Sequence, residues 1–405
     1  MTCASVPLPA AARPRSYELP ARWWLPLLGS VTVSFLAGSS APTPLYPVYQ
    51  GLWHFSAATV TAVFASYVVV LLAALLVFGR VSDYVGRKPV ILAALLLQLV
   101  AMALFATAGG VAMLFAGRIL QGLGTGAALA AIGAAMLDVD KQRGTIANAV
   151  APGLGTGFGA VLSGLLVHFL PAPTLLVYAV LALLYVLQIA GIALLPEPGQ
   201  RRPGVWSALR PQLALPASAR GALRGASPML VAGWALAGFF ASLGPALVHR
   251  VFGFDASLGG GLTLFVMAGS AAATVLVLRN AEADRLLRIG AIALAAGSAG
   301  VLVSVEAHSV AGFLFFAVLS GIGFGAGFQG GMRSTLAAAA PAERAGLLAV
   351  VFLIAYVAMG LPALLAGFAV VQTGNLVATG LAFGGAVLAL SLLALRLRAP
   401  AFRQG

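Results

Sequence analysis

One short segment of this 405-residue chain, 79–88, gathers charged residues at a spacing that suits ion pairing. It reads Gly-Arg-Val-Ser-Asp-Tyr-Val-Gly-Arg-Lys. Asp83 precedes Arg87 by four residues, which is pairing distance where the segment is helical. Gly79 and Gly86 lack a Cβ atom, so they permit a tight turn and a close approach of the backbone. The segment therefore predicts a charged turn between two helices.

Arg118 is the second feature that suggests a chemical role, because a charged residue lies there inside an apolar stretch. Placing an arginine in hydrocarbon costs about 2.5–3.5 kcal/mol on insertion scales, so its side chain should face the protein interior and have a partner there. Two roles remain open for it: it braces a helix by hydrogen bonds to backbone carbonyls, or it takes part in binding or coupling. Gln121 follows about one helical turn later and is a candidate for the same site.

Composition indicates the elements that must position these residues. Hydrophobic residues make up 61% of the chain and charged residues 8%, whereas soluble domains are about 25% charged. This excludes a water-soluble globule, and the long apolar runs exclude an outer-membrane barrel, whose alternating segments are about 10 residues long. A membrane helix needs about 20 apolar residues. The sequence predicts an all-α integral membrane protein with twelve transmembrane helices, near 24–48, 57–79, 89–108, 111–137, 144–168, 173–195, 228–251, 258–278, 288–305, 309–335, 345–371 and 375–396.

The longest interruption between apolar runs, 196–227, divides the chain into two six-helix bundles. It is rich in proline and arginine, which is typical of a polar linker. We expect an N-terminal tail, two bundles on either side of this linker, and a C-terminal tail, at 1–22, 23–195, 228–397 and 398–405. A shift of 199 residues superposes 121–126 on 320–325 and Asp83 on Glu282, so the two bundles are pseudo-symmetric repeats. Repeated halves build a site at the membrane midplane in many transporters.

The positive charges predict the direction in which the helices cross the membrane. Of 23 Lys and Arg residues, two are Arg118 and Arg250, and the others lie in the tails and in alternate loops. The positive-inside rule places those loops and both termini in the cytoplasm. This explains the net charge of +13 without a nucleic-acid partner, whose binding would need the charges on one soluble face.

The residues that the sequence lacks exclude several chemistries. The lone Cys3 has no second cysteine with which to form an internal disulfide or a thiolate metal site. Neither Lys88 nor Lys141 follows a glycine, so the chain has no G-x-x-x-x-G-K-[ST] phosphate loop. We therefore expect no enzyme activity, no cofactor and no metal site.

Two motifs carry a resemblance to a known family. The segment 79–88 matches G-x-x-x-D-x-x-G-R-[KR], and 118–124 matches R-x-x-x-G-x-G. The sequence thereby resembles the major facilitator superfamily over nearly its whole length, and its pattern is closest to the bacterial drug and metabolite efflux members. This implies the superfamily's two-bundle fold in a bacterial inner membrane. The fifth span keeps Gly144, Gly153 and Gly157 of the antiporter signature but not its proline and final glycines, which weakens the antiporter assignment.

The resemblance implies that the charged turn is a latch that closes the cytoplasmic side. In the family the aspartate, here Asp83, faces the start of the eleventh helix, here near 345–348. The arginine, here Arg87, pairs with an acid that ends the fourth helix, a place that Asp138 or Asp140 fills. The residues of the motif itself are Gly79, Asp83, Gly86, Arg87 and Lys88.

The resemblance also implies that the first, fourth, seventh and tenth spans, together with the eleventh, line a central cavity. Sparse polar groups in an apolar wall suit small amphipathic organic solutes. Prolines in the first span predict a kink near its outer end. The candidate cavity residues are Ser39, Thr43, Tyr46, Arg118, Gln121, Trp234, Gln329 and Tyr356.

Proton coupling usually needs a titratable group in the transport path. All ten acids of this chain lie in tails, loops or helix ends. If protons are coupled, we expect Asp138 or Glu306 to take part, or one of the histidines at the outer ends. The alternative is that the histidines are interfacial residues with no shared role. These histidines are His54, His168, His249 and His308.

Together these observations predict a monomeric secondary transporter in the lipid bilayer. It would move a small organic solute by alternating access, in proton-linked efflux. One alternative is uptake or facilitated diffusion of an anionic metabolite drawn by Arg118. Another is a sensor of the same fold that transports nothing, against which the retained latch argues because a static receptor needs no gate.

Overall fold

The computed structural model describes residues 19–199 and 203–398, so most of the two predicted tails lies outside the described residues. Within these ranges all regular structure is helical, and 12 helices are long and apolar enough to cross a membrane. This confirms the predicted all-α membrane class and the number of spans.

The N-terminal half contains six spans, of which the first is broken into two helices joined by a 3-10 turn. Short pieces of helix also occur before the first span and in the loop after the second. The elements are η1 (Ala21–Trp23), α1 (Trp24–Ser40), η2 (Thr43–Leu45), α2 (Tyr46–Trp53), α3 (Ala57–Phe78), α4 (Ser82–Val85), α5 (Arg87–Ala106), α6 (Val111–Val139), α7 (Lys141–Phe169) and α8 (Pro173–Ala193).

The C-terminal half repeats this plan after a short helix in the linker. Its first span is again followed by a separate short helix. The elements are α9 (Val205–Ala208), α10 (Ala217–Ser242), α11 (Gly244–Phe252), α12 (Ala256–Val277), α13 (Ala283–Glu306), α14 (Val310–Ala337), η3 (Pro341–Glu343), α15 (Arg344–Thr373) and α16 (Leu376–Arg398).

The linker is shorter than the predicted 196–227, because α10 begins at Ala217. Pro216 precedes this helix with φ −57° and ψ 144°, an extended conformation from which a helix can start. Ala219 and Leu223 are buried, so the added turns pack against the protein in spite of the nearby arginines. Pro228, the expected first residue of the span, lies inside the helix.

Both halves break their first span near the same end. In the N-terminal half Pro42 and Pro44 follow α1, which confirms the kink predicted from the prolines. In the C-terminal half α10 ends at Ser242, and Pro245 lies in the first turn of α11. The breaks place two irregular segments at corresponding positions in the two halves.

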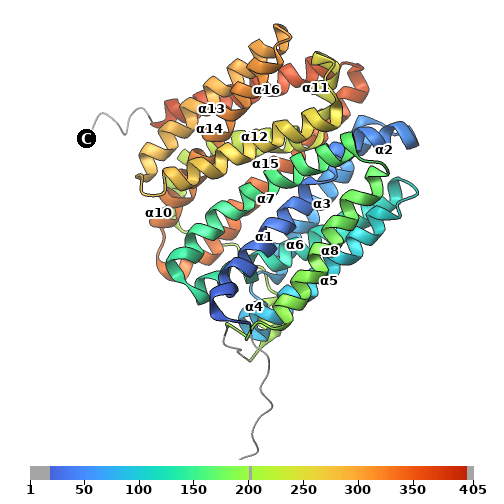
Figure 1. Cartoon of the computed structure of the whole chain (residues 1–405). Helices are drawn as coiled ribbons and strands as arrows, with labels where there is room; N and C mark the ends of the chain where they lie inside the picture. The colour runs from blue at the N-terminus through green and yellow to red at the C-terminus, as the bar shows by residue number, and fades with distance from the viewer. Residues whose placement is uncertain (1–18, 200–202, 399–405) are drawn as a thin grey trace, which may run out of the picture.

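Figure 1 shows the two halves side by side, with α7 running along α12 where they meet. A second seam is formed by α3 and α15. Small residues bring the first seam close: a Cβ on Gly261 of α12 would lie 2.6 Å from the carbonyl oxygen of Ala160 on α7. Close backbone approach of this kind is how glycine supports helix packing in lipid.

The two ends of the bundle differ in charge. We call the end that carries the loops 80–88, 138–143 and 279–288 the basic end. The opposite end carries the short connections 54–56, 170–172 and 253–255, which contain no Lys or Arg. Polar N-caps start helices at both ends, with side-chain oxygens that accept the free backbone N–H groups. These caps are Ser56, Asp140, Asp255 and Ser309.

Candidate functional site

Arg118 is fully buried in the first third of α6, where its guanidinium is held by groups from α1, α2 and its own helix. Nη1 donates to the backbone carbonyl of Ser39 at 2.7 Å and to Oε1 of Gln121 at 2.8 Å. Nη2 donates to the hydroxyl of Tyr46 at 2.7 Å. Gln121 in turn donates to the carbonyl of Gly38 at 2.8 Å. The guanidinium therefore ties α6 to the end of α1, beside the break.

Two tyrosine rings enclose the same guanidinium. The Cζ atom of Arg118 lies 5.7 Å from the ring centroid of Tyr46 and 5.3 Å from that of Tyr67 on α3. Cation–π contacts of this kind are worth about 2 kcal/mol or more when desolvated. The Nε atom of Arg118 is buried and has no hydrogen-bond partner. Three of the five N–H donors of the guanidinium are thus paired, and the Nε–H is buried without a partner.

Glycines on α6 allow α3, which carries Tyr67, to pack close to α6. A Cβ on Gly122 would lie 2.7 Å from the carbonyl oxygen of Tyr67, so only glycine lets α3 pack this closely. Tyr67 was not among the residues predicted from the sequence. Nothing in the apolar run around it marks the tyrosine as different from an interfacial aromatic, and its role follows from packing alone.

The C-terminal half contributes an aromatic cluster around Trp234 of α10. Its ring centroid lies 5.4 Å from Phe324 and 5.5 Å from Phe328, both on α14, and 5.3 Å from Tyr356 on α15. The indole Nε1 of Trp234 is buried and has no hydrogen-bond partner. Tyr356 stacks in turn on Phe352. Aromatic groups with one unpaired donor form this wall.

The two clusters meet between the halves. Tyr67 of α3 and Tyr356 of α15 belong to one buried apolar cluster, which Trp234 packs against. A continuous path of contacts therefore runs from Arg118 through Tyr67 and Tyr356 to Trp234. We call these four residues the central cluster.

Three further predicted cavity residues use their side chains for contacts outside the central cluster. Ser39 offers its backbone carbonyl to Arg118, while its hydroxyl donates to Leu36 of its own helix at 2.8 Å. Gln329 donates to the carbonyl of Val275 on α12 at 3.2 Å, within the C-terminal half. Thr43 lies at the break after α1 and contacts the other half, as described below.

The charged turn forms a network within the N-terminal half. Arg87 pairs with Asp83, and its Nε donates to Asp138 Oδ2 at 3.3 Å across to the end of α6. It also donates to the hydroxyl of Ser82 at 2.7 Å. Gly86 has a φ of +104°, which favours glycine and breaks the chain between α4 and α5. Of the two acids that fitted the resemblance, Asp138 is the partner in this conformation.

The expected neighbour of Asp83 at the start of the eleventh helix does not contact it here. Within the described residues, the hydrogen bond and ion pair of the Asp83 side chain go to Arg87. The start of α15 is met instead by the linker, where Ala214 N lies 3.4 Å from the carbonyl oxygen of Gly346. The predicted contact between Asp83 and 345–348 stays a prediction for another conformation.

Glu197 of the linker joins the network and was not singled out by the sequence. Its carboxylate accepts the backbone N–H groups of Arg87 at 2.7 Å and Lys88 at 3.1 Å, so it caps the start of α5. Lys88 Nζ donates back to the carbonyls of Ala193 and Leu195 at 2.6 and 2.8 Å. The partners are about a hundred residues apart in sequence, and only the fold brings them together.

At the opposite end, direct contacts join the two halves. The hydroxyl of Thr43 donates to the carbonyl of Ala241 at 2.8 Å, so the breaks of the first and seventh spans touch. His168 at the end of α7 and Asp255 at the start of α12 form an ion pair across the halves, provided that the imidazole is protonated. The halves are therefore tied together at this end, whereas the bonds of Asp83, Arg87 and Lys88 stay within the N-terminal half and the linker.

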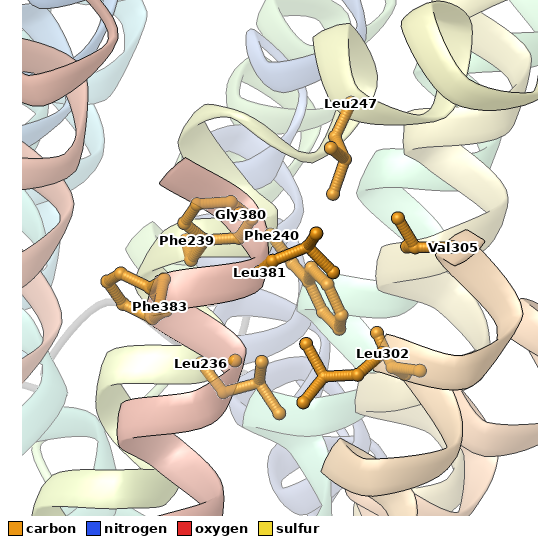
Figure 2. A pocket seen from close by; sticks show the side chains of 11 residues that line it. Leu236, Phe239, Phe240, Leu247, Leu302, Val305, Gly380, Leu381 and Phe383 are labelled. Atoms are coloured by element: carbon orange, nitrogen blue, oxygen red, sulfur yellow. The ribbon is translucent and has the colours of Figure 1, made fainter. Parts of the chain in front are cut away.

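A pocket lies in the C-terminal half, between α10, α13 and α16 and near α11 (Figure 2). None of its lining side chains is polar, and none of the predicted site residues lines it. It is distinct from the central cluster. The lining residues are Leu236, Phe239, Phe240, Leu247, Val301, Leu302, Val305, Gly380, Leu381, Phe383 and Gly384.

The described residues contain no group of three or more His, Cys, Asp or Glu side chains that could hold a metal ion. The side chains described above offer hydrogen bonds, aromatic rings and ion pairs.

Comparison with known proteins decides the family. The model of the Major Facilitator Superfamily matches residues 28–307, more than two thirds of the chain. The chain belongs to the major facilitator superfamily. It is accordingly a membrane transporter of this superfamily and not an enzyme.

A curated relative matches part of this major facilitator chain. Tetracycline resistance protein, class C, from Escherichia coli is 37% identical over 141 residues, which are 33% of this chain and 35% of that protein. The alignment thus spans about a third of the relative's length.

Solved structures match nearly the whole fold. The nucleoside transporter NupG has a TM-score of 0.69 at 13% identity, covering 94% of this chain and 100% of that one. The POT family transporter PepTSo has a TM-score of 0.70 at 14% identity, covering 96% and 100%. The human organic anion transporter MFSD10 (TETRAN) has a TM-score of 0.62 at 18% identity, covering 93% and 100%. At these identities the likeness shows the shared fold.

Proposed function

We propose that this major facilitator chain exports a small organic solute across the bacterial inner membrane in exchange for protons, as a monomer that works by alternating access. The observation that carries the proposal is the central cluster. It is built from both halves, so a rocking motion of one half against the other would open it to each side in turn.

The contacts of the two ends support alternating access. The opposite end is joined by Thr43 to Ala241, whereas the hydrogen bonds and ion pairs of Asp83 remain within its own half. The reverse state would release the opposite end and bring Asp83 to the start of α15, where a helix N-terminus attracts an anion. In that reverse state the latch motif would hold the basic end closed.

Orientation and direction rest on charge and on relatives. The basic loops and the positive-inside rule put the basic end and both termini in the cytoplasm. The partial likeness to a tetracycline resistance protein favours export, because a transporter protects a cell by removing a compound from it. Aromatic rings with unpaired donors suit a flat, partly polar solute.

The titratable groups of the gates would carry the proton coupling. No Asp or Glu side chain is buried in the described residues, so the groups that can exchange protons lie at the two ends. Asp138 at the basic end, and Glu306 and the histidines at the opposite end, are the candidates. A transport cycle that moves protons would then do so by opening and closing these ends.

The unpaired Nε of Arg118 favours a second candidate, uptake or facilitated diffusion of an anionic metabolite. A buried guanidinium attracts an anionic group. Three of its hydrogen bonds are already used by Ser39, Gln121 and Tyr46, which favours a neutral or weakly polar solute over an anion.

Flux in proteoliposomes with an imposed pH gradient tests the proposal against a panel of neutral aromatic and anionic compounds. We expect a neutral aromatic compound to accumulate when the proton gradient is imposed. The compound should move in the direction opposite to the protons. Flux that ignores the gradient would remove the coupling, and flux of anions alone would favour the second candidate. Absence of flux for the whole panel, from well-folded protein, would contradict the proposal and favour a sensor.

A further inference from the structure

His168 and Asp255 connect the two halves at the opposite end by charge. The Nδ1 atom of His168 lies 3.6 Å from Oδ2 of Asp255. His168 is in the last turn of α7 and Asp255 is the N-cap of α12, so the pair lies at the end of the seam between the halves. The ion pairs of Asp83 and Arg87, by contrast, stay within one half.

The geometry makes the attraction depend on a proton. A separation of 3.6 Å is too long for a good hydrogen bond from a neutral imidazole, so a strong attraction requires the charged form. The carboxylate is fixed in place because its Oδ1 accepts the backbone N–H of Leu258 at 2.7 Å. The switch therefore lies on His168.

Protons from the solvent reach the pair, because its side chains are 38% and 43% exposed. Histidine is the side chain whose charge changes between about pH 5 and 8. Of the elements that pack against α7, α6 carries the buried Arg118, whereas α1, α8, η2 and the start of α12 carry no other charged residue at this end. On α11, His249 has its Nδ1 3.1 Å from the carbonyl of Phe254, the residue before Asp255, and Arg250 is exposed, while His54 follows α2.

We propose that His168 and Asp255 form a proton-dependent lock, which holds the opposite end closed when His168 is protonated. Because binding and conformation are linked, a proton that favours closure is also bound more tightly in the closed state. This inference rests on the proposed function. With the basic end in the cytoplasm, the lock lies on the outer side of the membrane. External protons would then return the transporter to the state that is open to the cytoplasm.

A distance measurement across the opposite end tests the lock without any solute. In a Cys3→Ser background, spin labels at Leu52→Cys on α2 and Gln372→Cys on α15 report the separation of the halves at exposed positions away from the α7–α12 seam. In liposomes we expect the ratio of closed to open forms to rise about two- to fivefold between pH 8 and pH 5, the effect of one exposed ion pair.

Variants at the pair sharpen the test. His168→Gln should abolish this pH response, and His168→Lys should keep the end closed at both pH values. Asp255→Asn should also abolish it while preserving the helix cap, since asparagine caps as well as aspartate. Arg250→Gln is the matched control, because it removes an exposed charge of α11 outside the pair, and it should respond like the parent protein.

A full pH response in folded His168→Gln, or its absence in the parent protein, would overturn the lock. Monodispersity on gel filtration shows that each variant is folded, and His168→Lys predicts a gain that misfolding does not mimic. Because no solute is present, the result is separate from the proposed function. If the distance responds to pH in a protein that shows no flux, the lock is supported and the proposed function is not. If flux is found without the pH response, the lock is contradicted and the proposed function is not.

Discussion

The interiors of the two halves differ although their helices follow the same plan. In the N-terminal half a buried arginine and its partners cross-link α1, α2 and α6. A shift of 199 residues superposes Arg118 on Ala317, which is buried among apolar neighbours in the C-terminal half. The C-terminal half offers the rings around Trp234 instead. The difference teaches that one half holds the buried hydrogen-bond network around a cation and the other the aromatic cluster.

The loops after the second span of each half also differ, in the bonds that join them to a neighbouring helix. In the N-terminal half Arg87 reaches a carboxylate on the neighbouring helix. In the C-terminal half the direction is reversed, because Arg333 of α14 donates to the backbone carbonyls of Arg279 and Ala281 at 2.5 and 2.8 Å. An ion pair weakens when its carboxylate is protonated, whereas a backbone carbonyl has no such proton to gain. The N-terminal loop is therefore suited to switching and the C-terminal one to bracing.

The largest expected effect lies at Arg118. Arg118→Gln removes the charge and most of the hydrogen bonds to Ser39 and Tyr46, so solute flux should fall about tenfold to hundredfold, as for lost bonds to a charged group. The matched control is Gln329→Leu in the C-terminal half, which should retain most of the flux. Flux measured in proteoliposomes at equal protein density checks both. Equal losses in the two variants would remove the distinction between the halves.

A smaller effect is expected at Trp234. Trp234→Phe keeps an aromatic ring but removes the unpaired indole N–H, so the KM for a solute with a hydrogen-bond acceptor should rise about two- to tenfold. A solute without an acceptor should be transported as by the parent protein. An unchanged KM for both solutes would show that the C-terminal half contributes only an apolar surface, and would sharpen the contrast between the halves.

The smallest effect is expected at Glu197. Glu197→Gln retains an acceptor for the start of α5 but loses the negative charge at a helix N-terminus, a change worth about 0.3–1 kcal/mol. We expect a loss of thermal stability of a few degrees and a two- to fivefold loss of flux, which high salt should diminish because it screens the charge. The matched control is Glu343→Gln, at the turn before α15, whose carboxylate accepts the backbone N–H of Ala340. A larger flux loss in that variant would place the switching loop in the C-terminal half.

Much of the fold could be predicted from the sequence because membrane helices are specified locally. Hydrophobic runs of sufficient length predicted 12 spans, and the proline residues after α1 predicted the kink. The start of α10 could not be predicted from the same signals. Arginines and prolines there favour a linker, yet burial of Ala219 and Leu223 outweighs them.

The candidate site could be predicted in part. Arg118 stood out because an arginine is costly in an apolar helix, and Gln121 because it lies one turn away. Tyr67 and Glu197 carry no such signal. A tyrosine in an apolar run and a glutamate in a linker are ordinary, and their contacts arise only when α3 meets α6 and when the linker meets α5.

By itself the sequence determined the class of the protein, the number of its spans, the bias of charge between its ends and the presence of the charged turn. Each of these depends on residue types within one segment. Only the tertiary structure decided which groups surround Arg118, which acid pairs with Arg87 and that His168 meets Asp255. Those contacts join segments far apart in the chain, so they follow from the packing of helices and not from local pattern.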